Sequence, residues 1–180
     1  MNVLLIAVVA LVLVVALWYV AASNKLNRAV VKIDEALSGI DVALTKRYDV
    51  LTKMIDVVKA YAKHEQETLF EVIKLRSNMS VQERSDVNRA MDENFRKINV
   101  VAESYPELKS SENYKTLQQS ILDVEEHLQA ARRLYNSNVS LYNQAVVSFP
   151  TSIVAKNKNM TKRDFFEASD IKREDVTISL

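Results

Sequence analysis

The sequence predicts an all-α protein in which an N-terminal transmembrane helix is followed by a long antiparallel, up-and-down helical bundle and a mostly irregular C-terminal tail. Three observations lead to this fold class. An apolar run without any charge covers residues 3–22. Further along the chain, apolar residues recur at alternating steps of three and four, the spacing of helices that pack on other helices. The chain of 180 residues holds 1 Gly and 2 Pro, too few for the frequent turns of a β-rich or α/β protein.

The apolar run from Val3 to Ala22 contains no charged residue, no amide, no Gly and no Pro. Its roughly 20 residues correspond to about 30 Å of helix, which matches the hydrocarbon thickness of a bilayer. Trp18 and Tyr19 lie near its C-terminal end, and such amphipathic rings prefer the membrane interface. We therefore assign residues 1–22 to a membrane anchor whose partner is the lipid bilayer.

Two other interpretations of this run are a cleaved signal peptide and the core helix of a soluble protein. A signal peptide has a basic region before an apolar core of about 7–15 residues, whereas no Lys or Arg precedes this longer run. A core helix of this length would leave an apolar face that the rest of the chain is too short to cover. Lys25, Arg28 and Lys32 follow the run closely. The positive-inside rule then predicts a single-pass protein of the cell membrane, with its N-terminus outside and its bundle in the cytoplasm.

The charge composition excludes some classes of function. Charged residues make up 26% of the chain, and 24 Lys and Arg against 23 Asp and Glu leave a formal net charge of +1. A dedicated nucleic-acid-binding protein would show a strong basic excess, so we expect no nucleic-acid partner. The absence of Cys from the sequence excludes disulfides, thiolate metal ligands and cysteine nucleophiles.

Residues 23–150 are predicted to form the bundle, with three to four helices whose apolar seams follow the heptad pattern of a coiled coil. The first seam consists of Ile33, Leu37, Ile40, Leu44, Leu51, Met54, Val58 and Tyr61. The second helix, residues 81–102, carries on one face Val87, Met91, Phe95, Ile98 and Ala102. The last long helix, residues 111–148, carries Tyr114, Leu117, Ile121, Val124, Leu128, Ala131, Tyr135, Tyr142 and Ala145, with Asn138 in one slot. Ser80 and Glu83 have the spacing of a capping box at the start of the second helix, and Ser110 or Ser111 can cap the last one.

The lengths of these helices raise a question about the first one. At 1.5 Å per residue, the last long helix spans about 57 Å and the second only about 33 Å. A first helix that ran uninterrupted to Arg76 would leave much of its seam uncovered, whereas a break near Lys63–His64 would give arms of similar length. Pro106 should end the second helix near Tyr105, and Phe149–Pro150 should end the last one.

Five polar side chains form the candidate site. Arg47 occupies a seam slot among Ile, Leu and Met residues, and the matching face of the last long helix carries Glu125, Arg132, Asn136 and Asn143. Glu125 and Arg132 are separated by two helical turns and therefore share a face. A buried guanidinium must be paired, so we interpret the set as a structural polar clamp that fixes the register of the helices. A partner-binding stripe on the surface and a ligand site in the seam are the alternatives.

Patterns typical of catalysis and cofactor binding are weak. His64 and Glu65 begin like a zincin helix, but no second His follows four residues on. His127 follows Glu125 and Glu126 without the Glu-x-x-His spacing of a di-iron bundle. A single Gly excludes a phosphate-cradling loop. We therefore expect no catalytic, metal-binding or cofactor-binding residues, and no enzyme activity.

The tail, residues 151–180, lacks the helical periodicity of the bundle. Basic residues surround Phe165–Phe166, namely Lys156, Lys158, Lys162 and Arg163. Val176, Ile178 and Leu180 alternate with polar residues, which is the period of an extended strand. We expect a mobile tail with a short extended segment at 176–180. The alternative is that this segment adds as a strand to the sheet edge of a partner protein.

Four stretches of the sequence resemble a known family. They are IDVALTKRYDVL (residues 40–51), VVKAYAKHEQETLFEVIKLRS (57–77), ESYPELKS (103–110) and EEHLQAARRLYNSNVSLYNQAVVSFP (125–150). Together with the anchor and the FFEA of the tail, they are similar to the LemA family of bacterial membrane proteins over almost the whole chain. The resemblance implies an N-terminal anchor and an antiparallel bundle, described for the family as four helices, with no established enzymatic activity. Family members are often encoded beside a membrane zinc metallopeptidase or proteins with a TPM domain, which implies a link to envelope quality control.

We therefore expect a membrane-anchored scaffold or adaptor that presents a helical face or its tail to envelope proteins, a membrane metallopeptidase among them. Self-association through the long helices is a further expected contact. The alternative function is a ligand-binding or enzymatic bundle that uses the polar seam around Arg47, Glu125 and Arg132. These two functions are distinguished by whether the three side chains line an open pocket or a closed seam.

Overall fold

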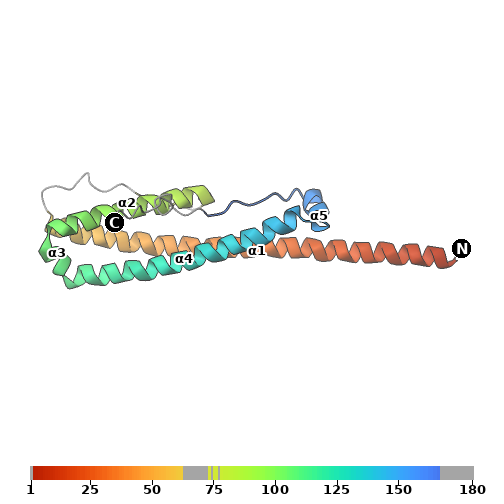
Figure 1. Ribbon diagram of the computed structural model, residues 1–180, viewed down its shortest axis with the longest axis horizontal. Helices are drawn as coiled ribbons and strands as arrows, with labels where there is room; N and C mark the ends of the chain where they lie inside the picture. Colours follow the sequence, from red (N-terminus) through yellow and green to blue (C-terminus); the bar gives the residue numbers. More distant parts are fainter. Residues whose placement is uncertain (1, 63–72, 74, 77, 167–180) are drawn as a thin grey trace, which may run out of the picture. The chain divides into compact units, whose positions relative to one another are not determined.

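The structure is a computed structural model that describes residues 2–62, 73, 75, 76 and 78–166 (Figure 1). These residues form α1 (Asn2–Tyr61), α2 (Val81–Ser104), α3 (Pro106–Ser110), α4 (Glu112–Val147) and α5 (Thr151–Asn157). No strand occurs in these ranges. The predicted all-α fold class is therefore confirmed, and so is a long apolar helix at the N-terminus.

The chain divides into two compact units, and each is described by itself. The anchor unit comprises Met1–Leu37 and Leu134–Phe165, and the bundle unit comprises Ser38–Arg133 and Phe166–Leu180. Both α1 and α4 contribute one segment to each unit. The division at Leu37 differs from the sequence-based boundary after residue 22, because α1 continues through the end of the anchor without interruption.

The first helix, α1, joins the apolar run and the basic residues after it in one helix of 60 residues. Side chains of the apolar run are exposed from Val3 to Leu17, whereas Trp18 and Tyr19 are half-buried. Ala22 is buried, so packing inside the anchor unit begins where the sequence places the end of the anchor. Figure 1 shows that the N-terminal part of α1 (red) extends well past α5, which belongs to the same unit.

The C-terminal end of α1 lies at Tyr61, just before Lys63–His64, where the helix lengths raised the question of a break. Lys63 and His64 themselves lie outside the described residues. Leu75 and Arg76 are described and are not helical, so the first helix does not run uninterrupted to Arg76. Tyr61 is 41% exposed rather than buried in the seam, since it is the last residue of the helix.

The core of the bundle unit is formed by α1, α2, α3 and α4. Its buried members are Leu51, Met54, Val58, Ile73, Met91, Ile98, Ala102, Leu108 and Tyr114. Most of them are seam positions that the alternating spacing predicts. Full burial of one large aliphatic side chain stabilises a fold by about 1.5–3 kcal/mol relative to exposure, so this cluster is what holds the unit together.

The second helix, α2, begins with the predicted capping box. The backbone N–H of Glu83 donates to the Ser80 hydroxyl at 3.1 Å, and the backbone N–H of Ser80 donates to the Glu83 carboxylate at 2.7 Å. The bond from the Ser80 N–H favours the ionised carboxylate and holds the pKa of Glu83 below its ordinary value of 4.5. At its other end α2 stops at Ser104, because Pro106 begins α3 and keeps Tyr105 out of helical geometry.

The long helix α4 has the predicted limits. At its start the backbone N–H of Tyr114 donates to the Ser111 hydroxyl at 3.3 Å, which confirms Ser111 as a cap. At its end the helix stops at Val147, before Phe149–Pro150. Because α4 runs through both units, it carries the buried positions of its seam into each of them.

The tail is more ordered than the sequence predicts over its first half. The short helix α5 buries Val154 and Ala155. The segment after α5 is not helical, but the Tyr135 hydroxyl donates to the backbone carbonyl of Asp164 at 3.0 Å and so holds it in the anchor unit. Seven helical residues are too few to show a period in the sequence, which is why α5 was missed. The predicted extended segment at 176–180 lies outside the described residues.

Candidate functional site

A buried arginine joins three helices of the bundle unit. Arg47 on α1 is 4% exposed. Its Nη2 lies 2.5 Å from Oδ1 of Asp92 on α2 and 3.1 Å from Oε2 of Glu125 on α4. Its Nη1 donates to the side-chain amide oxygen of Asn88, also on α2. Two carboxylates and one amide therefore surround a single cation at the point where the three helices meet.

A second arginine binds the same glutamate. Arg132, two turns further along α4, places its Nη2 3.1 Å from Oε1 of Glu125. Both guanidinium groups also lie over aromatic rings, Arg47 at 5.2 Å from the centre of Phe95 and Arg132 at 5.8 Å from the centre of Phe166. Such cation–π contacts are favourable by about 0.5–2 kcal/mol, the upper part of the range applying to enclosed pairs. From here on, Arg47, Asp92, Glu125 and Arg132 are called the polar clamp.

The polar clamp is a closed seam rather than an open pocket. The side chain of Arg47 is 5% exposed, and those of Asp92 and Glu125 are each 21% exposed. Each of its four charges is in direct contact with an opposite charge. Because the charges satisfy one another, this arrangement can fix three helices in one register, and it offers little free charge to a ligand.

The structure corrects the predicted site at Asn143. Asn136 and Asn143 both belong to the anchor unit. The Asn143 amide donates from Nδ2 to the backbone carbonyl of Arg163 at 2.9 Å, and its Oδ1 accepts from the Arg163 N–H at 2.8 Å. Both polar groups of this amide therefore hold the tail, and the prediction that Asn143 joins the set around Arg47 is wrong. Spacing along a helix places residues on one face but does not say which neighbour each of them meets.

Sequence reasoning missed the α2 side of the polar clamp. Counting back from Met91 in alternating steps of three and four leads to Asn88 and then to Arg84, two polar residues in seam slots. Both side chains are buried. Asp92 lies one turn after Asn88 and therefore on the same side of α2. That spacing is the signal in the sequence that could have found them.

Arg84, whose side chain is buried, makes a second ion pair in the bundle unit, with a carboxylate that is 42% exposed. Its guanidinium forms two parallel bonds with the Asp41 carboxylate, Nε to Oδ1 at 2.5 Å and Nη2 to Oδ2 at 2.7 Å. Its Nη1 donates to the backbone carbonyl of Met79. Bidentate pairs of this kind fix orientation as well as distance. The register of α1 against α2 is therefore set at two points, by Asp41 with Arg84 and by Arg47 with Asp92.

The described residues show no group of three or more His, Cys, Asp or Glu that could hold a metal ion. His64 lies outside these residues, and His127 is exposed on α4. The acidic groups of the polar clamp contact arginines and not a metal site. Their role in the structure is therefore to hold the helices together.

Within the described part of the chain, α1 is the one helix that is long and apolar enough to cross a membrane. None of its most apolar 18-residue window is buried in the protein. An uninterrupted apolar surface of this size marks contact with a membrane or with another apolar surface rather than with water. The exposure therefore agrees with membrane anchoring through the N-terminal part of α1.

Comparison with known proteins gives the family. A sequence profile of the LemA family matches residues 36–180, a range that includes the whole polar clamp. Protein LemA of Metamycoplasma hominis is 31% identical over 166 residues, which cover 89% of this chain and 76% of that protein. The magnetosome protein MamQ of Magnetospirillum gryphiswaldense is 26% identical over 66 residues, 37% of this chain and 24% of that protein. The extent of the profile match and the similarity to Protein LemA show that the chain belongs to the LemA family.

Proposed function

We propose that this protein is a membrane-anchored scaffold or adaptor, whose bundle is displayed on the cytoplasmic side of the cell membrane for envelope proteins to bind. The observation that carries the proposal is the continuity of α1. One helix contains both the exposed apolar run and the α1 side of the bundle core. No flexible linker separates the two, so the anchor itself delivers the bundle to the membrane.

The polar clamp supports the same proposal against its alternative. A ligand-binding or enzymatic bundle would have to use Arg47, Glu125 and Arg132. Arg47 is already in contact with two carboxylates, so an anionic ligand would have to displace them from a site that is nearly closed. A closed clamp suits a bundle that binds its partners through the outer faces of its helices.

Exposed apolar side chains of the bundle unit are the contact points that we propose. Val42 on α1, Val100 on α2 and Leu122 on α4 are 55%, 66% and 63% exposed. Partners of the proposed scaffold are envelope proteins, with a membrane metallopeptidase as the class that the family resemblance suggests and a second copy of the chain as the other.

A photo-crosslinking amino acid at Val100 or Leu122 is expected to trap envelope proteins in living cells, because these side chains offer apolar surface to a partner. The adducts would be purified from solubilised membranes and identified by mass spectrometry. Thr52, an exposed polar position on α1, is the matched control for random collisions. Adducts at Val100 and Leu122 that are no more frequent than at Thr52 would contradict the scaffold function. Deleting residues 175–180 in the same experiment tests the tail, since a docking strand would account for a subset of adducts.

The orientation of the anchor is proposed from charge. Lys25, Arg28 and Lys32 follow the apolar run, and the residues of this chain before Val3 carry no Lys or Arg. Basic residues are usually retained on the cytoplasmic side, and this rule supports a cytoplasmic position for the bundle.

Alkaline phosphatase fused after Leu180 is therefore expected to be inactive, because it folds only outside the cytoplasm, and a fluorescent protein at the same position should be bright. Enzyme activity and fluorescence of whole cells, each normalised to the amount of fusion protein, measure this. The same phosphatase behind a secretory signal serves as the active control. An active phosphatase fusion at Leu180 would overturn the orientation.

A further inference from the structure

A basic groove lies between α1 and α4 in the anchor unit. It has a volume of about 770 Å³ and is lined on the α1 side by Lys25, Arg28 and Lys32. On the other side it is lined by Asn138 and Gln144 of α4 and Thr151 of α5, among others. A volume of this size is within the range of sites that take a small molecule or a lipid headgroup.

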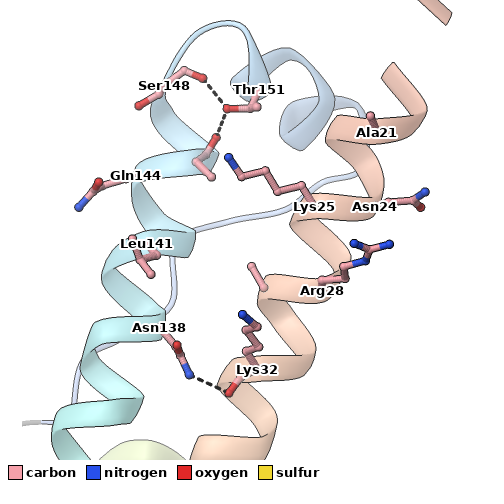
Figure 2. Close-up of a pocket in the computed structure, with 12 residues that line it drawn as sticks. Ala21, Asn24, Lys25, Arg28, Lys32, Asn138, Leu141, Gln144, Ser148 and Thr151 are labelled. Carbon is pink, nitrogen blue, oxygen red and sulfur yellow. Dashed lines mark hydrogen bonds between the residues drawn. The ribbon is translucent and has the colours of Figure 1, made fainter. Parts of the chain in front are cut away.

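The cations of the basic groove are not used inside the protein. Figure 2 shows Lys25 and Lys32 directed into the space between the two helices, while Arg28 points to the outer side of α1. Within the described residues, no hydrogen bond or ion pair engages the side chains of these three residues. The Asn138 amide donates to the backbone carbonyl of Lys32 at 3.0 Å, which joins the two walls without neutralising a charge. Among the residues that the structure describes, no carboxylate lines the groove.

Positive charge is concentrated in the anchor unit as a whole. Its segments, residues 1–37 and 134–165, carry seven Lys and Arg against three Asp and Glu. The remainder of the chain carries 17 Lys and Arg against 20 Asp and Glu. Lys158, from the segment after α5, adds a cation beside α1, where its Nζ donates to the Asn27 side chain at 3.2 Å. A chain that is almost neutral overall therefore presents a local positive field next to its anchor.

If the bilayer ends at Ala22, the membrane end of the groove, near Lys25, lies at the depth of lipid phosphates. The headgroup layer of a bilayer is about 5–8 Å thick on each side of the hydrocarbon. Counted along the helix from Ala22, Lys25 lies about 4.5 Å beyond the apolar run, inside the headgroup layer, whereas Lys32 lies about 15 Å beyond it and reaches that layer only through its long side chain. Ala21, in the last turn of the run, lines the membrane end of the groove. An acyl chain can therefore lie along the anchor while its headgroup enters the groove.

We propose that the basic groove binds the phosphate headgroup of an anionic membrane lipid. Lys25 and Lys32 neutralise the phosphate, and the Asn138 and Gln144 amides, each with one N–H still available, donate to the phosphate oxygens. The Thr151 hydroxyl already donates to backbone carbonyls of α4 and its C-terminal turn, so it can only accept a hydrogen bond from a glycerol hydroxyl. This site rests on the proposed membrane insertion of α1, but not on the orientation of the anchor or on a protein partner. It goes beyond anchoring, because it gives the protein a preference for one class of lipid.

The single Trp of the chain provides the test. Trp18 lies two turns before Lys25 on the same side of α1, so its fluorescence is quenched by brominated lipids that occupy this position. The full chain would be reconstituted in equal mixtures of phosphatidylglycerol and phosphatidylcholine, with one or the other lipid brominated. Quenching by brominated phosphatidylglycerol is expected to report a local preference of about 25-fold, since each of the two engaged lysines contributes roughly fivefold.

Matched variants separate a site from diffuse charge. Lys25→Gln combined with Lys32→Gln is expected to reduce the ratio of phosphatidylglycerol to phosphatidylcholine beside Trp18 to nearly one. Lys156→Gln with Lys162→Gln removes the same charge from residues of the anchor unit that do not line the groove, and should leave most of the preference. Equal losses in both double variants, or no preference in the parent, would overturn the lipid site. Millimolar inorganic phosphate should have no effect, and its displacing the lipid would assign the groove to a soluble anion instead.

The same quenching measurement separates a failure of the lipid site from a failure of membrane anchoring. If neither brominated lipid quenches Trp18, α1 does not insert, and membrane anchoring fails. If both quench it equally, α1 inserts and only the lipid site fails.

Discussion

Arg47→Ala is expected to lower the free energy of unfolding of the detergent-solubilised chain by about 3–5 kcal/mol. The substitution removes the cation that contacts Asp92 and Glu125, and leaves two largely buried carboxylates close together without it. It also removes the donor to the Asn88 side chain. Urea unfolding followed by circular dichroism would measure the loss.

Two further variants test whether the loss comes from the unpaired charge. Arg96→Ala removes an ion pair with Glu93 that is about half exposed, and should change stability by less than about 1 kcal/mol. Arg47→Met combined with Asp92→Leu removes cation and anion together and leaves Glu125 paired with Arg132, so it should recover much of the stability. An Arg47→Ala chain that unfolds like the parent would show that the polar clamp does not hold the helices.

Phe166→Ala is expected to cost about 3 kcal/mol, the lower end of the range for truncating a buried Phe. Phe166 is 3% exposed, and its ring lies under the Arg132 guanidinium. Its removal would leave a cavity beside the polar clamp and take away the cation–π contact. The same urea unfolding experiment would measure this loss.

The neighbouring Phe165 is the matched control, because it has the same side chain but is 48% exposed. Phe165→Ala should change stability by less than about 1 kcal/mol, since a half-exposed ring loses little buried surface. Equal effects of the two substitutions would mean that the tail is not held by Phe166. The contrast therefore tests the difference between the mobile tail that the sequence predicted and the packed one in the structure.

The long helices could be predicted from the sequence because their apolar seams extend over many turns. In α1 the buried residues Ile40, Leu44 and Leu51 follow the alternating spacing, and Arg47 stands out as the one charge among them. That exception pointed correctly to Glu125 as a partner. In a long periodic stretch a single exception does not obscure the period, so the stretch can be recognised as a helix from the sequence alone.

The remaining features depend on contacts between segments that are distant in sequence. Asp92 and Asn88 could not be assigned to Arg47 from spacing alone, because α2 carries polar residues in several seam slots and the sequence does not say which slot meets which. Asn143 was misplaced for the same reason. The basic groove could not be predicted from the sequence either, since Lys25 and Lys32 resemble an ordinary topology signal until the structure places Asn138 of α4 on the opposite wall of the groove.

The polar clamp also has a consequence for how the sequence of such a protein can change over generations. Its two arginines and two carboxylates sum to zero charge, and each member touches at least one opposite charge. Losing Arg47 alone strands an anion, and losing Asp92 alone weakens the hold on a cation, so each single step passes through a less stable protein. Exchange of one of these residues is tolerated mainly where its partner has already changed. The four positions therefore restrict one another's inherited variation, although they lie on three different helices.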